Sequence, residues 1–210
     1  MFSRIRLFLS HAFLLPEVPP DFSPLFIDKN EHYRELVHNW SLDAAYVALS
    51  YTDELKKELE PYKYFSRKEK VDLFIPHLFE CFSLFCLEKI DKTAMITSVP
   101  IFFLSHLRRG YNHSEVLARA IAKQSGNSYH RLLRKTKWTR HQAKLSKYQR
   151  MKNVRDTFSL RKKYTESIRG KDIILVDDII STGSTANECA KILKQSGARH
   201  IYGLFLATWD

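Results

Sequence analysis

One stretch of this chain decides its fold: Ile173-Ile-Leu-Val-Asp177-Asp178-Ile-Ile-Ser181-Thr182-Gly183-Ser184-Thr185. The continuous apolar run 173–176 predicts a strand buried in a parallel sheet. Two adjacent carboxylates follow at the edge of the sheet, and a Thr-Gly-Ser-Thr turn then leads into a helix expected over 185–196. Because Gly183 permits a backbone conformation that side chains resist, the turn can present its N–H groups and the helix N-terminus to one anion.

The ligand that fits this pattern is a phosphate joined to a ribose. Hydroxyl groups of the turn add donors for a phosphate, and the two carboxylates can accept hydrogen bonds from sugar hydroxyls. The alternative interpretation is that Asp178 is a turn residue and Ser184 a helix cap. That alternative explains one or two residues of the stretch, but not their combination.

The elements around this stretch alternate between strand and helix. We expect a strand over 95–99, a helix from Ser114 to Gly126 and a last strand over 201–207. This alternation predicts an α/β fold with a doubly wound, mostly parallel sheet, whose ligands bind at the carboxyl ends of the strands.

The residues before 95 predict a smaller flanking unit. We expect a strand over 44–51, a short helix that Asp53 caps and that ends near Pro61, and a long amphipathic helix after the capping box Ser66-x-x-Glu69. We therefore divide the chain into an N-terminal flanking (hood) domain, 1–94, and a core, 95–210.

Three blocks of the sequence resemble a known family. Residues 175–185 resemble the signature of type I phosphoribosyltransferases. A second block resembles that of the ComF family, the competence-associated group of this fold: Val99-Pro100 with Leu107-Arg108-Arg109-Gly110-Tyr111-Asn112-His113-Ser114-Glu115. The third block is Thr136…Gln142-x-x-Leu145…Arg150-x-x-Asn153-Val154…Phe158. The resemblance covers about residues 44–207 and implies a type I phosphoribosyltransferase fold.

This resemblance implies phosphoribosyl pyrophosphate and Mg²⁺ as ligands. Asp177 and Asp178 would hold the ribose 2- and 3-hydroxyls, partly through Mg²⁺, and residues 181–185 would bind the 5-phosphate. The loop after Pro100 would face the pyrophosphate. The expected ligand-binding residues are Asp177, Asp178, Ile179, Ile180, Ser181, Thr182, Gly183, Ser184, Thr185, Arg108 and Arg109, and the expected catalytic residues are Asp177, Asp178, Arg140 and Lys144.

Two departures from the family pattern affect the expected chemistry. Many members begin with a cysteine-rich zinc ribbon, whereas this chain has no cysteine before Cys81, so we expect no bound zinc. Purine-salvage relatives carry an acid at the position of Ser181, where it acts on the base. The serine puts that base chemistry in doubt and leaves the acceptor unidentified.

The segment 131–163 is strongly basic. It contains thirteen lysines and arginines against the single acid Asp156, with Trp138, His141, Tyr148 and Phe158 between them. One interpretation is a loop that closes over the bound ligand and brings cations to the leaving pyrophosphate. A second is a surface for single-stranded DNA or RNA with aromatic stacking platforms, and a third is a solvated basic face without a ligand.

Composition bounds the compartment and the partners. The net charge of +11 permits nucleic acid, phosphorylated metabolites or anionic lipid as partners. Three cysteines without a Cys-x-x-Cys pair argue against a disulfide framework, and we interpret them as small buried apolar residues. The apolar run 7–15 contains Ser10 and His11, so we interpret it as a docking segment and expect a cytoplasmic protein without a membrane span.

Two functions remain open at this point. The first is an enzyme that transfers a phosphoribosyl group from phosphoribosyl pyrophosphate to a nitrogen nucleophile, or that hydrolyses or exchanges the pyrophosphate. The second is a non-catalytic or regulatory module on the same fold that handles single-stranded nucleic acid. The resemblance implies a place in natural transformation beside helicase and recombination proteins, and the fold permits a homodimer.

Overall fold

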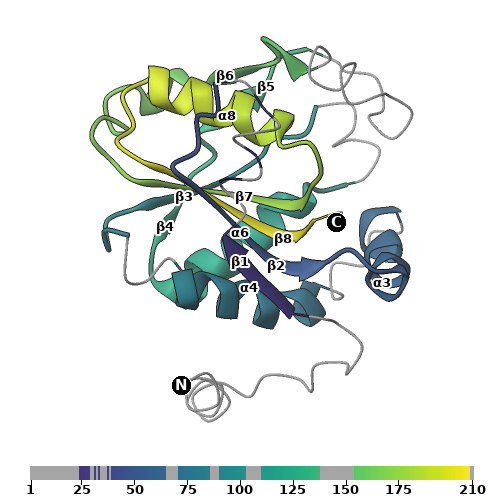
Figure 1. Cartoon of the computed structure of the whole chain (residues 1–210). Coiled ribbons are helices and arrows are strands. Elements are labelled where there is room, and N and C mark those ends of the chain that lie inside the picture. Colours follow the sequence, from purple (N-terminus) through teal and green to yellow (C-terminus); the bar gives the residue numbers. More distant parts are fainter. Residues whose placement is uncertain are drawn as a thin grey trace.

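The fold is built on one six-stranded sheet (Figure 1). The computed structural model describes residues 24–28, 31, 33, 37, 39–64, 71–85, 90–102, 110–137 and 154–208. Across the sheet the strands are β1 (Pro24–Asp28), β2 (Ala44–Ser50), β8 (Ile201–Thr208), β7 (Ile173–Ile180), β3 (Met95–Ser98) and β4 (Ser128–Tyr129). β1 runs antiparallel to β2, and the other strands run parallel to one another. The predicted α/β class with a mostly parallel sheet is confirmed.

Helices cover both faces of this sheet. α4 (Val71–Phe85) and α6 (His113–Ser125) pack on one face. α8 (Ser184–Gln195) packs on the other, together with the hairpin of β5 (Leu133–Lys135) and β6 (Phe158–Leu160). The remaining helices are α3 (Asp53–Tyr64) and the short 3-10 helix η3 (Lys162–Tyr164). Each face of the sheet therefore has its own apolar core.

The strand order fixes where a ligand can bind. From β3 the chain crosses through α6 to β4 on one side, and from β7 it crosses through α8 to β8 on the other side. The two helices lie on opposite faces, so the order reverses between the neighbouring strands β3 and β7. In open α/β sheets the crevice at such a reversal, beyond the carboxyl ends of the strands, is where ligands bind. The end of β7 lies at this crevice.

Most predicted elements are confirmed, and two differ. β7 continues through Asp177 and Asp178 to Ile180, whereas we predicted that the strand ends before the acids. α3 passes through Pro61 and ends at Tyr64, and its first turn is capped by Thr52 rather than by Asp53, because the Leu55 N–H donates to Thr52 Oγ1 at 3.2 Å. Ser66 and Glu69 lie outside the described residues.

The N-terminal part of the chain shares the main sheet. β2 pairs with β8 over Ala44 to Ser50, and α4 packs beside α6 on the same face. The expected boundary between residues 94 and 95 stays a prediction. Cys81 and Cys189 are buried and have free thiols, as expected of small apolar residues, and Cys86 lies outside the described residues. In the described part of the chain, no helix has the length and apolar character that crossing a bilayer requires.

Candidate ligand site at the end of strand β7

Asp177 and Asp178 lie in the last half of β7, where the strand leaves the core. The first four residues of the strand are buried, whereas both acids are half-buried. The Asp178 N–H donates to Asp177 Oδ1 at 3.0 Å, and the Ile179 N–H donates to Asp178 Oδ1 at 2.7 Å. One oxygen of each carboxylate is thus oriented by the backbone.

Ser114 connects α6 to these acids. This residue lies in the first turn of the helix, is buried, and donates from Oγ to Asp177 Oδ1 at 2.5 Å. A short hydroxyl–carboxylate bond of this kind is among the stronger protein hydrogen bonds. Ser114 therefore links the second sequence block to the predicted site, whereas the sequence indicated only that this residue starts a helix.

The turn after β7 has the backbone that the sequence predicts. Gly183 has φ 71° and ψ −7°, a left-handed conformation, and serves as the N-cap of α8 without any side-chain cap bond. Thr182 Oγ1 and Ser184 Oγ lie 2.9 Å apart, and the Ser184 N–H lies 3.4 Å from Thr182 Oγ1. Because the first N–H groups of a helix have no intrahelical acceptor, this end of α8 is suited to a phosphate.

Asp177 and Asp178 are also suited to hold a metal ion together with the oxygens of a bound ligand. Among the described residues, no three histidine, cysteine, aspartate or glutamate side chains gather as a metal site. Mg²⁺ is usually held by one or two carboxylates together with phosphate oxygens and waters. The adjacent acids Asp177 and Asp178 match that donor set.

The structure also shows what two further residues of the second block, Asn112 and Glu115, contact. Asn112 is buried, and its Nδ2 donates to the Val99 carbonyl at 2.9 Å, which ties the start of α6 to the end of β3. Glu115 accepts from Arg119 Nε and Arg131 Nε, both at 2.8 Å. Burial alone would raise the pKa of Glu115, but the two guanidinium groups outweigh it and lower that pKa.

A half-open cavity lies beside the end of β3. It is lined by Ser98, Pro100, Ile101, Asn112, Glu115, Arg131, Leu133 and Arg161. The start of the loop that we expected to face pyrophosphate thus borders a hollow with two arginines. Arg108, Arg109, Arg140 and Lys144 lie outside the described residues, so the structure does not place these four predicted cations.

The β5–β6 hairpin adds a half-buried cation. Lys135 is half-buried, and its Nζ lies 5.5 Å from the centre of the Phe158 ring. Burial lowers the pKa of Lys135, and the nearby Cys189 and Asp177 oppose that shift. Glu188 of α8 accepts from the Asp156 N–H at 3.0 Å, which fixes the hairpin to the helix. The sequence marked Lys135 only as one of many basic residues, whereas the fold sets its charge near Asp177.

Comparisons with known proteins match this chain over the same elements. The model of the phosphoribosyl transferase domain family matches residues 87–205. Competence protein F of Haemophilus influenzae is 33% identical over 107 residues, which are 50% of this chain and 46% of that protein. DNA utilization protein YhgH of Salmonella typhimurium is 33% identical over 107 residues, 50% of this chain and 45% of that protein.

Competence protein ComFC of Bacillus subtilis is 27% identical over 152 residues, 70% of this chain and 57% of that protein. The chain spans about half the length of the first two relatives. Together, the domain match and these relatives confirm the resemblance to the ComF family that the sequence blocks indicated.

Proposed function

The chain belongs to the phosphoribosyl transferase domain family, and from this premise we propose that it binds phosphoribosyl pyrophosphate together with Mg²⁺ at the end of β7. One observation carries the proposal: Asp177 and Asp178 directly precede a left-handed Gly183 turn at the start of α8. The acids accept hydrogen bonds from the ribose hydroxyls and share Mg²⁺ with the ligand, while the turn and the helix N-terminus bind the 5-phosphate.

The same arrangement supports phosphoribosyl transfer. When pyrophosphate leaves, the reacting ribose carbon becomes electron-poor and the leaving group gains negative charge, so catalysis requires orientation and cations rather than a covalent nucleophile. Arg131 and Arg161 border the cavity at the end of β3, and Lys135 lies near Asp177. Bound Mg²⁺ would neutralise part of the pyrophosphate charge. The acceptor is a nitrogen nucleophile of unidentified structure.

Thermal unfolding tests the binding. A ligand at 100 times its Kd stabilises the folded state by about 2.7 kcal/mol, which raises Tm by roughly 5–10 °C for a chain of this size. We expect that shift with phosphoribosyl pyrophosphate and Mg²⁺, and a smaller one with EDTA in place of Mg²⁺. Magnesium ATP serves as the control, because it carries a triphosphate on the 5-oxygen and has neither a separate 5-phosphate nor a pyrophosphate on the first ribose carbon. Equal shifts with both ligands would contradict the proposal.

A pyrophosphate assay separates an enzyme from a binding module. The protein is incubated with phosphoribosyl pyrophosphate, Mg²⁺ and a panel of nucleobases and amines. An enzyme releases pyrophosphate above the rate of the same mixture without protein, whereas a ligand-regulated module shows the thermal shift without release.

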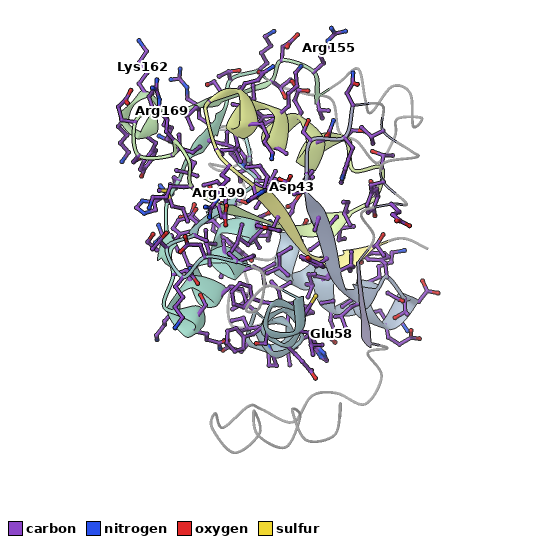
Figure 2. The ribbon with its side chains drawn as sticks, turned by 60° about the vertical axis from the view of Figure 1, so that its left-hand side comes forward. Asp43, Glu58, Arg155, Lys162, Arg169 and Arg199 are labelled. Atoms are coloured by element: carbon purple, nitrogen blue, oxygen red, sulfur yellow. The ribbon has the colours of Figure 1, made fainter. Side chains whose placement is uncertain are left out.

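A second function, handling of single-stranded nucleic acid, is favoured by the surface around the hairpin. Arg134, Lys137, Arg155, Lys162 and Lys163 are exposed there. In Figure 2, Arg155 and Lys162 project from the end of the molecule opposite to Glu58 of α3. Two of the relatives are named competence proteins, and one is named a DNA utilization protein. We extend that role to this chain as a proposal for DNA uptake.

Salt-dependent DNA binding tests this second function. Each phosphate contact on a single strand contributes about 0.7 to the slope of log K against log salt. The variant Lys162→Ala/Lys163→Ala should flatten that slope by about 1.4, if both lysines contact phosphates. The matched control is Lys56→Ala/Lys57→Ala, which removes two exposed lysines from α3. Anisotropy of a labelled oligonucleotide with the same slope for both variants would exclude η3 from the interface.

A further inference from the structure

Two aromatic rings from the N-terminal part of the chain lie against the back of the Gly183 turn. The Tyr33 and Trp40 rings stack with centroids 5.5 Å apart and planes 19° apart. A Cβ added to Gly183 would lie 2.8 Å from Trp40 Cζ3 and 3.1 Å from Tyr33 Cδ1. The turn therefore touches both rings through its backbone, and a side chain at Gly183 would collide with them.

Hydrogen bonds fasten this segment on both sides of the turn. Tyr33 Oη and Thr208 Oγ1 lie 2.8 Å apart, which joins the segment to the end of β8. The Ser41 N–H donates to Asn187 Oδ1 at 2.7 Å, and Asn187 lies in the first turn of α8. We name Tyr33, Val37 and residues 39–41 the strap.

The strap takes the place of a conventional helix cap. At most helix starts a Ser, Thr, Asp or Asn side chain fixes the first turn, but α8 begins at a left-handed glycine without a side-chain cap bond. A glycine in that position adds backbone freedom rather than order. The strap opposes that freedom, because ring contact and two hydrogen bonds hold the start of α8 and the end of β8.

We propose that the strap is a positioning device for the 5-phosphate subsite and that Trp40 is its main positioning residue. This inference rests on the proposed function, since it assumes that the turn 181–185 binds the phosphate. Backbone N–H groups bind an anion well only when they are held in one arrangement before it arrives, because ordering them on binding costs free energy. The strap supplies that order through its ring contacts with the Gly183 turn and its hydrogen bonds to Thr208 and Asn187.

Two probes separate this inference from the proposed function. Ribose 5-phosphate carries the group that the turn would bind, whereas magnesium pyrophosphate carries the leaving group, which the turn does not contact. We expect Trp40→Ala to weaken binding of ribose 5-phosphate about tenfold in calorimetry, because the turn must then be ordered when the ligand binds. The affinity of Trp40→Ala for magnesium pyrophosphate should stay within about twofold of the wild-type affinity, a difference that we count as no change.

Leu42→Ala is the matched control. Leu42 directly follows the strap and is buried. Its Cδ2 packs against Gly203 of β8, where an added Cβ would lie 2.5 Å away, and it is not among the atoms nearest to Gly183. This variant should lose stability and keep the wild-type affinity for ribose 5-phosphate. An equal loss of ribose 5-phosphate affinity in both variants would show a general effect of stability and overturn the positioning role of Trp40.

Tyr33→Phe provides a second variant should Trp40→Ala fail to fold. It keeps the ring stack and removes only the hydroxyl bonded to Thr208. We expect an affinity loss of about threefold for ribose 5-phosphate, in line with the loss of one hydrogen bond, and none for magnesium pyrophosphate. Unchanged ribose 5-phosphate affinity in the variants, with wild type binding both probes, overturns the inference alone. If wild type binds neither ribose 5-phosphate nor magnesium pyrophosphate, the proposed function and the strap inference are overturned together.

Discussion

Ser114 joins two parts of the sequence that lie 63 positions apart. Its hydroxyl donates to Asp177 and thereby restricts the rotation of that carboxylate. Ser114→Ala should weaken binding of magnesium phosphoribosyl pyrophosphate by about 2- to 12-fold, the range that corresponds to one hydrogen bond of about 0.5–1.5 kcal/mol. Calorimetry measures the loss. Ser128→Ala, an exposed serine on β4, is the control, and equal affinity of the two variants would contradict a role for Ser114.

Glu115 gives the stability of the chain a specific pH dependence. Its pKa is lowered from the ordinary value of 4.5, because hydrogen bonds from Arg131 and Arg119 outweigh the effect of burial. A group whose pKa falls on folding stabilises the native state above its unfolded pKa, and that stability is lost as the pH falls through the folded pKa. The relevant window therefore begins near pH 4.5 and extends below it.

Urea unfolding of wild type and Glu115→Gln at pH 6 and pH 3 tests this assignment. At pH 6 wild type should be the more stable protein, because the glutamine cannot form the ion pairs. At pH 3 the difference should shrink, since protonation removes the charge from wild type as well. A gap that stays constant across this range would show that the charge of Glu115 does not contribute.

At the scale of elements, α3 depends on Thr52 for its first turn. The Lys56 N–H donates to the Thr52 carbonyl at 2.9 Å, and the Leu55 N–H donates to its side chain. Thr52→Ala should lower the free energy of unfolding by about 1 kcal/mol, the usual effect of losing an N-cap, whereas Thr52→Ser should retain most of it. Chemical denaturation compares the two. Equal losses would mean that the hydroxyl is not the stabilising group.

The sequence predicts elements well where local pattern and burial agree. The helix at 113–125 has a periodic apolar face and a terminating Gly126 in the left-handed conformation, so its limits are readable. The cap of α3 is not readable, because Thr52 and Asp53 are both good caps and only the backbone geometry separates them. Asp has low strand propensity, which is why we predicted that β7 ends before Asp177, whereas pairing with β8 continues the strand to Ile180.

The β5–β6 hairpin escaped prediction for a different reason. Each strand has three residues, and the partners Leu133 and Leu160 are joined by a long connection rather than a tight turn. Hairpin signals in a sequence depend on short loops with turn residues, and none is present here. The position of Lys135 near Asp177 follows from this pairing, so the sequence could not show it.

At the scale of the whole molecule, the candidate site is assembled from distant segments. The acids and the Gly183 turn are contiguous and could be predicted from one motif. Ser114 and Trp40 reach that motif only through the order of strands and helices, which brings α6 and the strap to it. Local periodicity has no information about such contacts, because they depend on the packing of both sheet faces.

The strand order explains why these segments meet at one point. The reversal between β3 and β7 leaves the carboxyl ends of both strands open, with α6 and α8 starting on opposite sides of the gap. A ligand there can contact the loop after β3, the acids of β7 and the first turn of α8 together. The central claim is that phosphoribosyl pyrophosphate occupies this position with Mg²⁺.

Calorimetry of phosphoribosyl pyrophosphate in Mg²⁺, on wild type and on Asp177→Asn/Asp178→Asn, tests that claim most directly. The double variant keeps the shape of both side chains and removes the charges that we propose to hold Mg²⁺ and the ribose hydroxyls. Its control, Asp91→Asn/Asp156→Asn, removes two acids whose side chains are 43% and 69% exposed, outside the site. We predict at least a tenfold loss of affinity, about 1.4 kcal/mol, for the first variant and wild-type affinity for the second. Equal affinity of all three proteins, or no binding by wild type at millimolar ligand, would contradict the account.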